Sequence, residues 1–281
     1  MNGGHWVIDG EPARAVPATD RGLQFGDGIF ETLFAVDGRL PWLERHYERL
    51  RTGCRRLGLA PPDSASLRAD LARLDLPPGP AVVKILVTAG SGGRGYARPE
   101  TPVCRRLLGV FPFPGRPAHF TLQWCLQTLA RQAALAGIKH LNRLEQVLAR
   151  REVAAGEADE GLVLDTAGNV IEATAANLFL VRDGQLVTPA LDQSGVAGIM
   201  RSQVLETAQH LGIRCRTESV SPADVLAAEE CFLSNCLIGI RPVIHLQSSQ
   251  RHSELDGREW EAGPVTTRLQ QLTPWPPGEV D

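Results

Sequence analysis

The stretch AGIKHLNRLEQVLARRE, residues 136–152, places Lys139 just ahead of an apolar pattern typical of an amphipathic helix. Lysine is scarce in this chain, because only Lys84 and Lys139 among the 29 Lys and Arg residues are lysines. A lysine in a partly desolvated site loses its proton readily and can attack an aldehyde, which an arginine cannot do. The ordinary alternative is a solvated lysine at a helix start. Position 139 is therefore the first candidate for a chemical role.

Composition limits the class of protein. The 281 residues, 43% hydrophobic and 22% charged, suffice for one large domain or two ordinary ones. A net charge of -3 provides no basic field, so we expect no nucleic-acid partner. No apolar run approaches the roughly 18 residues that span a bilayer, so we expect no membrane segment. The N-terminal residues lack a signal-peptide pattern, and we expect a cytoplasmic protein.

The cysteines and histidines show no spacing typical of a metal site. The 6 cysteines include no C-x-x-C pair, and the 7 histidines include no H-E-x-x-H pattern. Dispersed cysteines in a chain of this length are typical of buried thiols in a reducing compartment. We therefore expect neither a disulfide framework nor a metal ion.

The first part of the chain mixes strand and helix patterns. Asp-Gly pairs in HWVIDGEPARAV (residues 5–16) and TLFAVDGRLPW (residues 32–42) lie between apolar runs, which predicts hairpins. Apolar side chains recur in steps of three and four over residues 43–57, which predicts one helix. The run AVVKILVTAG, residues 81–90, is rich in β-branched residues and predicts a buried strand.

A proline-rich stretch separates the two parts of the chain. The prolines of FPFPGRPAHF oppose regular structure, so we place a linker at residues 113–120. It would join a domain of residues 1–112 to a domain of residues 121–281, which carries Lys139. Residues 161–189 predict a meander of strands separated by turns. The expected class is α+β in two domains with mixed or antiparallel sheets, because the regular alternation of a doubly wound fold is missing.

The segment GSGGRG, residues 90–95, satisfies the dinucleotide-binding pattern G-x-G-x-x-G. That interpretation also requires a helix to begin at the loop. Pro99 and Pro102 stand where the helix would be, so we expect a hairpin or binding loop instead. Arg94 lies within this loop, and an arginine in such a place can bind carboxylates.

Further groups give Lys139 a possible chemical context. Glu172 ends a predicted strand, and a carboxylate beside a pyridine nitrogen keeps that nitrogen protonated. GVAGIM, residues 195–200, precedes a predicted helix whose free N–H groups would face an anion. LSNCLIG, residues 233–239, offers a second turn, and Arg49 could pair with a phosphate. Each alone is more often structural, but together they are the parts needed to hold pyridoxal 5′-phosphate.

Six stretches of the sequence resemble the signatures of one family, the fold-type IV pyridoxal-phosphate enzymes. They are DRGLQFGDGIFET, RHYERL, GIKHLNRLEQVLAR, EATAANLF, GVAGIMR and SNCLIGIRPV, in this order along residues 5–245. The family includes branched-chain and D-amino-acid aminotransferases and aminodeoxychorismate lyases. The resemblance implies a small N-terminal α/β domain and a larger C-terminal domain with a barrel-like sheet. It also implies a homodimer with the cofactor between the domains.

The resemblance also implies roles for single residues. Lys139 matches the Schiff-base lysine, Glu172 the partner of the pyridine nitrogen, and Arg49 the phosphate arginine. The remaining matches, which concern the cofactor pocket and its phosphate turns, are Asn177, Ile199, Met200, Asn235 and Cys236.

Within the family, several residues depart from the aminotransferases. Those enzymes usually carry a tyrosine shortly after the lysine, whereas the tyrosines here are Tyr47 and Tyr96. They usually offer threonine hydroxyls to the phosphate, where this chain has Met200 and Cys236. We therefore expect backbone amides to bind the phosphate at these two positions.

The stretches GSGGRGY and LAGIKHLNRLEQVL are similar to those of the aminodeoxychorismate lyases. That similarity implies conversion of 4-amino-4-deoxychorismate to 4-aminobenzoate and pyruvate, with Lys139 as the base and Glu172 stabilising the cofactor. Arg94 is the candidate for binding a substrate carboxylate. The alternatives are a D-amino-acid or branched-chain aminotransferase of the same fold, and a binding protein without activity. The presence of both Lys139 and Glu172 argues against the last.

Overall fold

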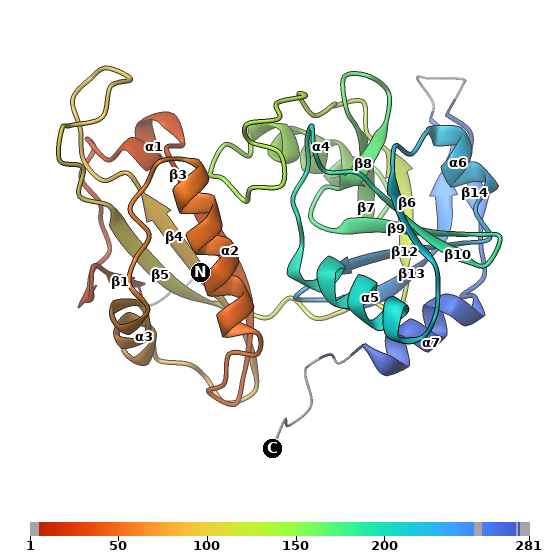
Figure 1. The fold of residues 1–281 in the computed structure, drawn as a ribbon, viewed down its shortest axis with the longest axis horizontal. Coiled ribbons are helices and arrows are strands. Elements are labelled where there is room, and N and C mark those ends of the chain that lie inside the picture. The colour runs from red at the N-terminus through yellow and green to blue at the C-terminus, as the bar shows by residue number, and fades with distance from the viewer. Residues whose placement is uncertain (1–5, 250–254, 274, 276–281) are drawn as a thin grey trace. The chain divides into compact units, whose positions relative to one another are not determined.

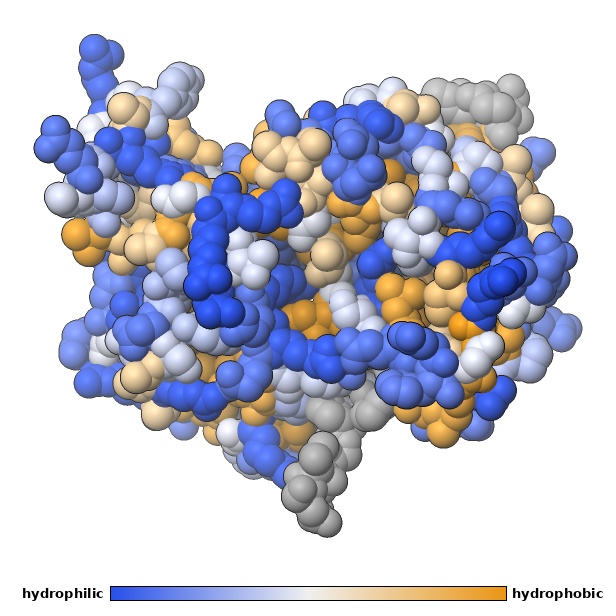
Figure 2. All heavy atoms as spheres, viewed as in Figure 1, coloured by the Kyte–Doolittle hydropathy of each residue, from blue (hydrophilic) through white to orange (hydrophobic). Residues whose placement is uncertain are grey.

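The computed structural model describes residues 6–249, 255–273 and 275 (Figure 1). The chain divides into two compact units. Unit 1 comprises Met1–Pro114 and Ile138–Asn142, and unit 2 comprises Gly115–Gly137 and Arg143–Asp281. In the described part, no helix combines the length and apolar character that crossing a bilayer requires. Taken one at a time, the units show mainly hydrophilic side chains on the face drawn in Figure 2, with apolar ones between them.

Unit 1 is built from one antiparallel sheet and helices that pack on it. Its strands are β1 (Trp6–Ile8), β2 (Glu11–Pro12), β3 (Gly28–Val36), β4 (Pro80–Thr88) and β5 (Arg105–Pro112). Its helices are α1 (Arg21–Phe25), α2 (Leu43–Arg56) and α3 (Ser64–Ala72). The strand order in the described residues is β2-β1-β5-β4-β3. The helix expected over residues 43–57 and the strand expected over residues 81–90 are thus confirmed as α2 and β4.

The core of unit 1 lies between the sheet and its helices. Leu33, Val83 and Leu108 alternate with outward-facing residues on three neighbouring strands, and all three are fully buried. Leu50 of α2 and Leu67 of α3 pack in the same cluster, so both helices cover one face. Period-two strands meeting helices with one apolar face explain this two-layer arrangement.

Residues 138–142 pair with the edge of the unit 1 sheet. The Phe30 amide donates to the Lys139 carbonyl at 2.9 Å, and the Leu141 amide donates to the Gly28 carbonyl at 2.9 Å. Ile138 is buried in the same core as α2 and α3. We expected Lys139 in the C-terminal domain at the mouth of a helix. The structure instead groups its segment with unit 1, because it pairs with β3.

Unit 2 contains the remaining elements. Its strands are β6 (Phe120–Trp124), β7 (Glu160–Leu164), β8 (Val170–Ala173), β9 (Asn177–Arg182), β10 (Gln185–Pro189), β11 (Cys215–Glu218), β12 (Glu230–Asn235), β13 (Gly239–Gln247) and β14 (Arg258–Glu259). Its helices are α4 (Leu144–Ala154), α5 (Ile199–His210), α6 (Pro222–Ala227) and α7 (Pro264–Leu272). The meander expected over residues 161–189 is present as β7 to β10.

The sheet of unit 2 closes on itself. In the described residues the strand order β9-β12-β13-β6-β7-β8 returns to β9, because Glu172 of β8 pairs with Asn177 of β9. β10 and β11 extend the sheet from β9. Apolar side chains such as Leu122, Leu162 and Leu178 fill one shared core and are fully buried. This confirms the expected α+β class with a barrel-like sheet in the second domain.

Candidate active site

Lys139 lies beside an aromatic ring of β3. Its Nζ is 4.4 Å from the centroid of the Phe30 ring. The Nζ of Lys84 on β4 is 5.1 Å from the same centroid, so both lysines of the chain contact one ring. Burial lowers the pKa of Lys84. Lys139 is itself half-buried.

Arg49 is joined to the next residue of β3. Its Nε donates to Oε1 of Glu31 at 2.8 Å, and its Nη2 donates to Oε2 at 2.5 Å. Burial acts to raise the pKa of Glu31, but the charge and hydrogen bonds of Arg49, with those of His46, lower it to about 2. Lys139 and Arg49 thus contact Phe30 and Glu31, two successive residues of β3 whose side chains point to opposite faces of the strand. The sequence analysis identified Arg49 but missed Glu31.

Glu172 and Asn177 together hold one peptide unit of unit 2. Oε2 of Glu172 accepts from the Val196 amide at 2.9 Å. Nδ2 of Asn177 donates to the Val196 carbonyl at 2.8 Å. Both side chains are buried and face each other across the β8–β9 pairing. The glycine loop at residues 195–198 is therefore fixed by Glu172, the expected partner of the pyridine nitrogen, and Asn177, which is expected to close the cofactor pocket.

The same loop leads directly into α5. Gly198 is the N-cap residue of this helix and makes no side-chain capping bond. A Cβ at Gly198 would lie 2.0 Å from Oδ1 of Asn177, so only glycine fits there. The first amides of a helix have no earlier helical carbonyl to bind and point toward anions. The buried side chain of Met200 leaves its backbone amide as the group that could serve this purpose.

The second expected phosphate turn joins β12 to β13. Oδ1 of Asn235 accepts from the amides of Leu237 and Ile238, at 2.8 and 2.9 Å. The Asn235 side chain therefore shapes the turn, which leaves its backbone and that of Cys236 for a ligand. Beside them, the Oγ of Ser234 is fully buried and, within the described residues, has no hydrogen-bond partner. A buried hydroxyl of this kind is a candidate donor to a missing acceptor.

Arg94 lies in an exposed loop that a buried arginine supports. The Arg21 guanidinium donates to the carbonyls of Gly95, Tyr96 and Ala97 at 3.0, 2.7 and 3.2 Å. No helix begins at residues 90–95, which lead through bends to β5. Arg94 itself is exposed, as a residue that meets an incoming anion must be.

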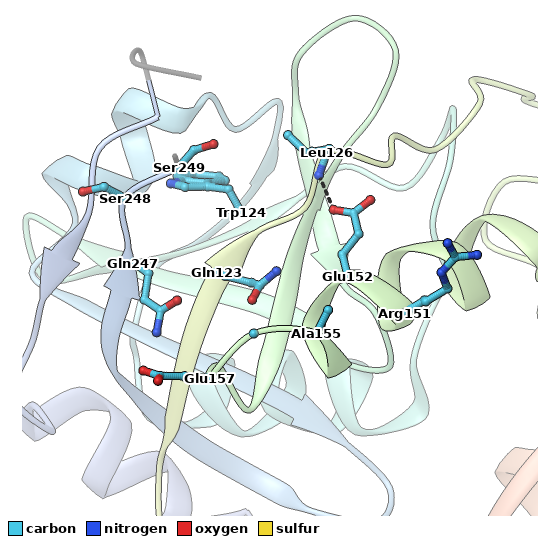
Figure 3. A pocket seen from close by; sticks show the side chains of 11 residues that line it. Gln123, Trp124, Leu126, Arg151, Glu152, Ala155, Glu157, Gln247, Ser248 and Ser249 are labelled. Atoms are coloured by element: carbon cyan, nitrogen blue, oxygen red, sulfur yellow. Dashed lines mark hydrogen bonds between the residues drawn. The ribbon is translucent and has the colours of Figure 1, made fainter. Parts of the chain in front are cut away.

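Unit 2 also contains a cavity of about 760 Å³ (Figure 3). Residues of β6, α4 and the end of β13 line it, among them Gln123, Glu152 and Gln247. Glu152 accepts from the Leu126 amide there at 2.7 Å. None of the expected site residues lines this cavity, so we do not assign the cofactor to it. In the described part of the chain, no cluster of three or more His, Cys, Asp or Glu is arranged to hold a metal ion.

Comparison with known proteins identifies the family to which this chain belongs. Residues 28–246 match the family described as amino-transferase class IV, which spans most of the chain. The chain belongs to the class IV aminotransferase family. Among its relatives, an aminodeoxychorismate lyase of Vibrio harveyi is 36% identical, covering 94% of this chain and 97% of the relative. A D-alanine aminotransferase of Listeria monocytogenes is 28% identical, covering 94% and 91%.

A solved structure of the class IV family extends this result. The crystal structure of 4-amino-4-deoxychorismate lyase from Pseudomonas aeruginosa is 44% identical, with a TM-score of 0.86. The match covers 95% of this chain and 97% of that chain. The resemblance to fold-type IV enzymes that the motifs indicated is therefore confirmed.

Proposed function

We propose that this chain is a pyridoxal-phosphate-dependent lyase that converts 4-amino-4-deoxychorismate into 4-aminobenzoate and pyruvate. The observation that carries the proposal is 44% identity, over nearly the whole chain, to a solved lyase of that name. The curated relative at 36% identity bears the same activity in its name. Aminotransferases are also relatives, but at lower identity.

The residues of this chain fit the cofactor. Lys139 would attach its aldehyde covalently, and Glu172 would face its pyridine nitrogen. Arg49 and the amides of Ile199 and Met200 would bind its phosphate. Two observations support the fit: the first turn of α5 has no side-chain cap, and the Oγ of Ser234 is buried without a partner in the described residues.

The side chains assigned to the second phosphate turn and the pocket wall act through their backbone contacts. We assign the Cys236 amide to the phosphate, with Asn235 shaping the turn through its two accepted hydrogen bonds. Asn177 would close the pocket while it holds the Val196 carbonyl. Because backbone amides would bind the phosphate at positions 200 and 236, no hydroxyl needs to replace the threonines that aminotransferases usually carry there.

A short covalent connection supports joint action of Lys139 and Glu172. Only Ile138 separates Lys139 from Gly137, whose amide donates to the Gly195 carbonyl at 2.9 Å within unit 2. Gly195 precedes Val196, the residue that Glu172 holds. Lys139 therefore lies two positions along the chain from a residue that is hydrogen-bonded to that loop.

Each residue then has a defined task. When bound, pyridoxal phosphate supplies an electron sink for the charge that develops as a proton leaves the substrate. Glu172 keeps a proton on the pyridine nitrogen, so that the sink stays effective. Lys139, as a neutral amine, takes the proton from ring C4 of the substrate. The bond between the ring carbon and the enolpyruvyl oxygen breaks, and the departing group takes a proton back from the Lys139 ammonium to become pyruvate. Formation of the aromatic ring makes the step favourable.

The substrate carries two carboxylates, and we assign Arg94 to one of them. Its exposed position on a loop that Arg21 supports suits an incoming anion. Arg98 has a different task, because its guanidinium binds Asp27 and the carbonyls of Leu57 and Gly58. It therefore holds the loop to the end of α2.

We also propose a homodimer in the cytoplasm. Leu144, Val147 and Leu148 lie at helical spacing on α4 and are exposed in the single chain. An apolar helix stripe of this kind is typical of a surface that a second copy covers. The dispersed cysteines of the sequence, without a C-x-x-C pair, are typical of a protein in a reducing compartment.

Product analysis tests the activity. Purified protein with pyridoxal phosphate and 4-amino-4-deoxychorismate should release 4-aminobenzoate and pyruvate in equal amounts without a keto-acid acceptor. Product formation only when an acceptor is added would contradict the lyase and support the aminotransferase alternative. Borohydride should fix the cofactor on the Lys139 peptide. Lys84→Arg should keep that label and Lys139→Arg should lose it, which is a matched pair because the chain has only these two lysines.

A further inference from the structure

Arg49 is held by a carboxylate that neither the motifs nor the proposed reaction assigns. Glu31 on β3 accepts two hydrogen bonds from one guanidinium, at 2.8 and 2.5 Å. Two parallel bonds to a single carboxylate fix the plane of a guanidinium as well as its position. The edge of Arg49 that carries its other donors therefore has a set direction.

A third residue completes the arrangement. Nδ1 of His46 lies 2.7 Å from Oε2 of Glu31, and both side chains are buried. One carboxylate oxygen thus meets both Arg49 and His46, which come from neighbouring turns of α2. Because the pKa of Glu31 is about 2, this carboxylate is charged at every pH at which the enzyme would work.

The position of Glu31 on β3 is unusual for a charged side chain. Its neighbours on the same face of the strand, Ile29 and Leu33, belong to the apolar core of unit 1. Burying a carboxylate there carries a desolvation penalty that only well-placed donors offset. A hydrophobic residue would pack at this position with less penalty, so the carboxylate calls for a reason beyond packing.

We propose that Glu31 is a positioning residue for phosphate recognition, because it orients the guanidinium of Arg49 toward the cofactor phosphate. The inference rests on the proposed function and deepens it. Two effects oppose each other when Glu31 is neutralised. Arg49 loses a countercharge, which favours phosphate, and it loses its fixed orientation, which disfavours it. The double hydrogen bond makes orientation the dominant effect, because bidentate pairing depends on angle as well as charge.

The test compares binding of two ligands by full-length protein freed of cofactor. Pyridoxal 5′-phosphate and pyridoxal share the aldehyde and ring and differ in the phosphate alone. Glu31→Gln should raise the dissociation constant for pyridoxal phosphate about tenfold and change the dissociation constant for pyridoxal by no more than about twofold. The glutamine oxygen can accept from Nε, but its NH₂ group opposes the donor on Nη2. Tighter binding of pyridoxal phosphate, or equal weakening of both ligands, would overturn the inference.

A second variant covers the case in which Glu31→Gln does not fold. Arg49→Lys keeps the positive charge beside Glu31 but cannot form the double hydrogen bond. It should lose a comparable part of the preference for pyridoxal phosphate over pyridoxal. Full retention of that preference would show that charge alone suffices and would overturn the inference.

Another buried pair of unit 1 provides the control. Nε of Arg106 donates to Oδ2 of Asp70 at 2.6 Å, and Asp70 is nearly as buried as Glu31. Asp70→Asn should lower the melting temperature without changing the preference between the two ligands. If the unaltered protein itself showed no preference for pyridoxal phosphate, the proposed function would fail along with this inference. A preference that Glu31→Gln leaves intact would overturn the inference alone.

Discussion

Two glycine-rich loops, one in each unit, are held in opposite ways. The loop at residues 90–95 comes after β4, and the buried Arg21 binds the carbonyls just beyond it, from Gly95 to Ala97. The loop at residues 195–198 is held by Glu172 and Asn177, which bind the amide and carbonyl of Val196, and it opens α5. The first loop fits a known nucleotide-binding pattern, whereas the second does not.

The two loops differ in the element to which their glycines lead. A helix after the loop at residues 195–198 aligns several amides toward one point, which favours an anion. The loop at residues 90–95 leads to a proline-containing segment and then to β5, so its glycines permit a bend without creating such a site. We therefore expect the succeeding element and the side chains that hold a loop, more than its glycine spacing, to decide which of the two loops can bind an anion.

The largest expected effect separates the two tasks of Glu172. In Glu172→Gln the side-chain oxygen can still accept from the Val196 amide, so the loop should keep its shape. The negative charge that we propose to face the cofactor is lost, so kcat should fall on the order of 10²- to 10³-fold, as when a preorganised electrostatic group is removed. Steady-state kinetics and cofactor absorbance would measure this. An equal loss of thermal stability and cofactor retention would show that Glu172 acts mainly as a loop clamp.

The next effect concerns the support of the first loop. Arg21→Gln removes a charged donor from three carbonyls, each such bond contributing roughly 1.5–3 kcal/mol at most. We expect faster amide hydrogen exchange in residues 92–98 and a higher KM, because Arg94 loses its fixed base. Arg68→Gln is the matched control, since the Arg68–Glu44 pair is exposed and should contribute about 0–1 kcal/mol. Unchanged exchange in Arg21→Gln would contradict the assigned support.

Substituting alanine for one glycine in each loop compares the two loops directly. Gly198→Ala should destabilise the protein by about 1–3 kcal/mol, because its Cβ would overlap Oδ1 of Asn177. Gly93→Ala in the first loop meets nothing within 4 Å and should change stability by no more than about 0.5 kcal/mol. Chemical denaturation of both variants measures the contrast. A similar loss of stability in both variants would show that the loop at residues 195–198 can adjust to the added Cβ and is not rigid, contrary to our expectation.

The smallest expected effect is on how the local stability of the first loop, residues 90–95, and its support by Asp27 change with pH. Burial acts to raise the pKa of Asp27, but Arg98 and Arg21 outweigh it, so the folded pKa lies below the usual 3.8. A depressed carboxyl pKa stabilises the fold above its unfolded value, and that stabilisation is lost as pH falls through the folded pKa. Protection against hydrogen exchange around Arg98, relative to the intrinsic exchange rate at each pH, should therefore fall below about pH 4. Asp27→Asn should show the lower protection already at neutral pH and little further change on acidification.

Local elements of the fold were predictable from the sequence because their signals are short-range. The Asp-Gly pairs at Asp9, Asp37 and Asp183 adopt positive φ and turn the chain as expected. The pairing of Lys139 with Phe30 was not predictable, because it joins segments far apart in sequence. The apolar periodicity placed Lys139 at a helix mouth, whereas α4 begins only at Leu144.

The residues of the candidate site could be predicted from the sequence only in part. Motifs proposed Glu172, Asn177 and the start of α5 as site residues through their similarity to a family, and the structure shows that all three meet at one loop. They did not reveal that Asn235 caps its own turn, since asparagine fits both tasks. Glu31 carried a signal that went unused: a lone carboxylate on the inward face of an apolar strand requires a partner. Its partner Arg49 lies on a different element, so only the structure could name it.

The pairing of residues 138–142 with β3 has a consequence for synthesis on the ribosome. β3 emerges early, but its neighbour Lys139 lies 109 positions further along the chain than Phe30. Nascent residues 1–114 can collapse around α2 and α3. The edge strand β3 keeps unpaired backbone groups, which can pair with other chains, until residues 138–142 emerge. The Lys139 segment would thus take its place in the sheet only after much of the polypeptide has been translated. A shortened chain ending at Pro114 would leave the same edge uncovered for good.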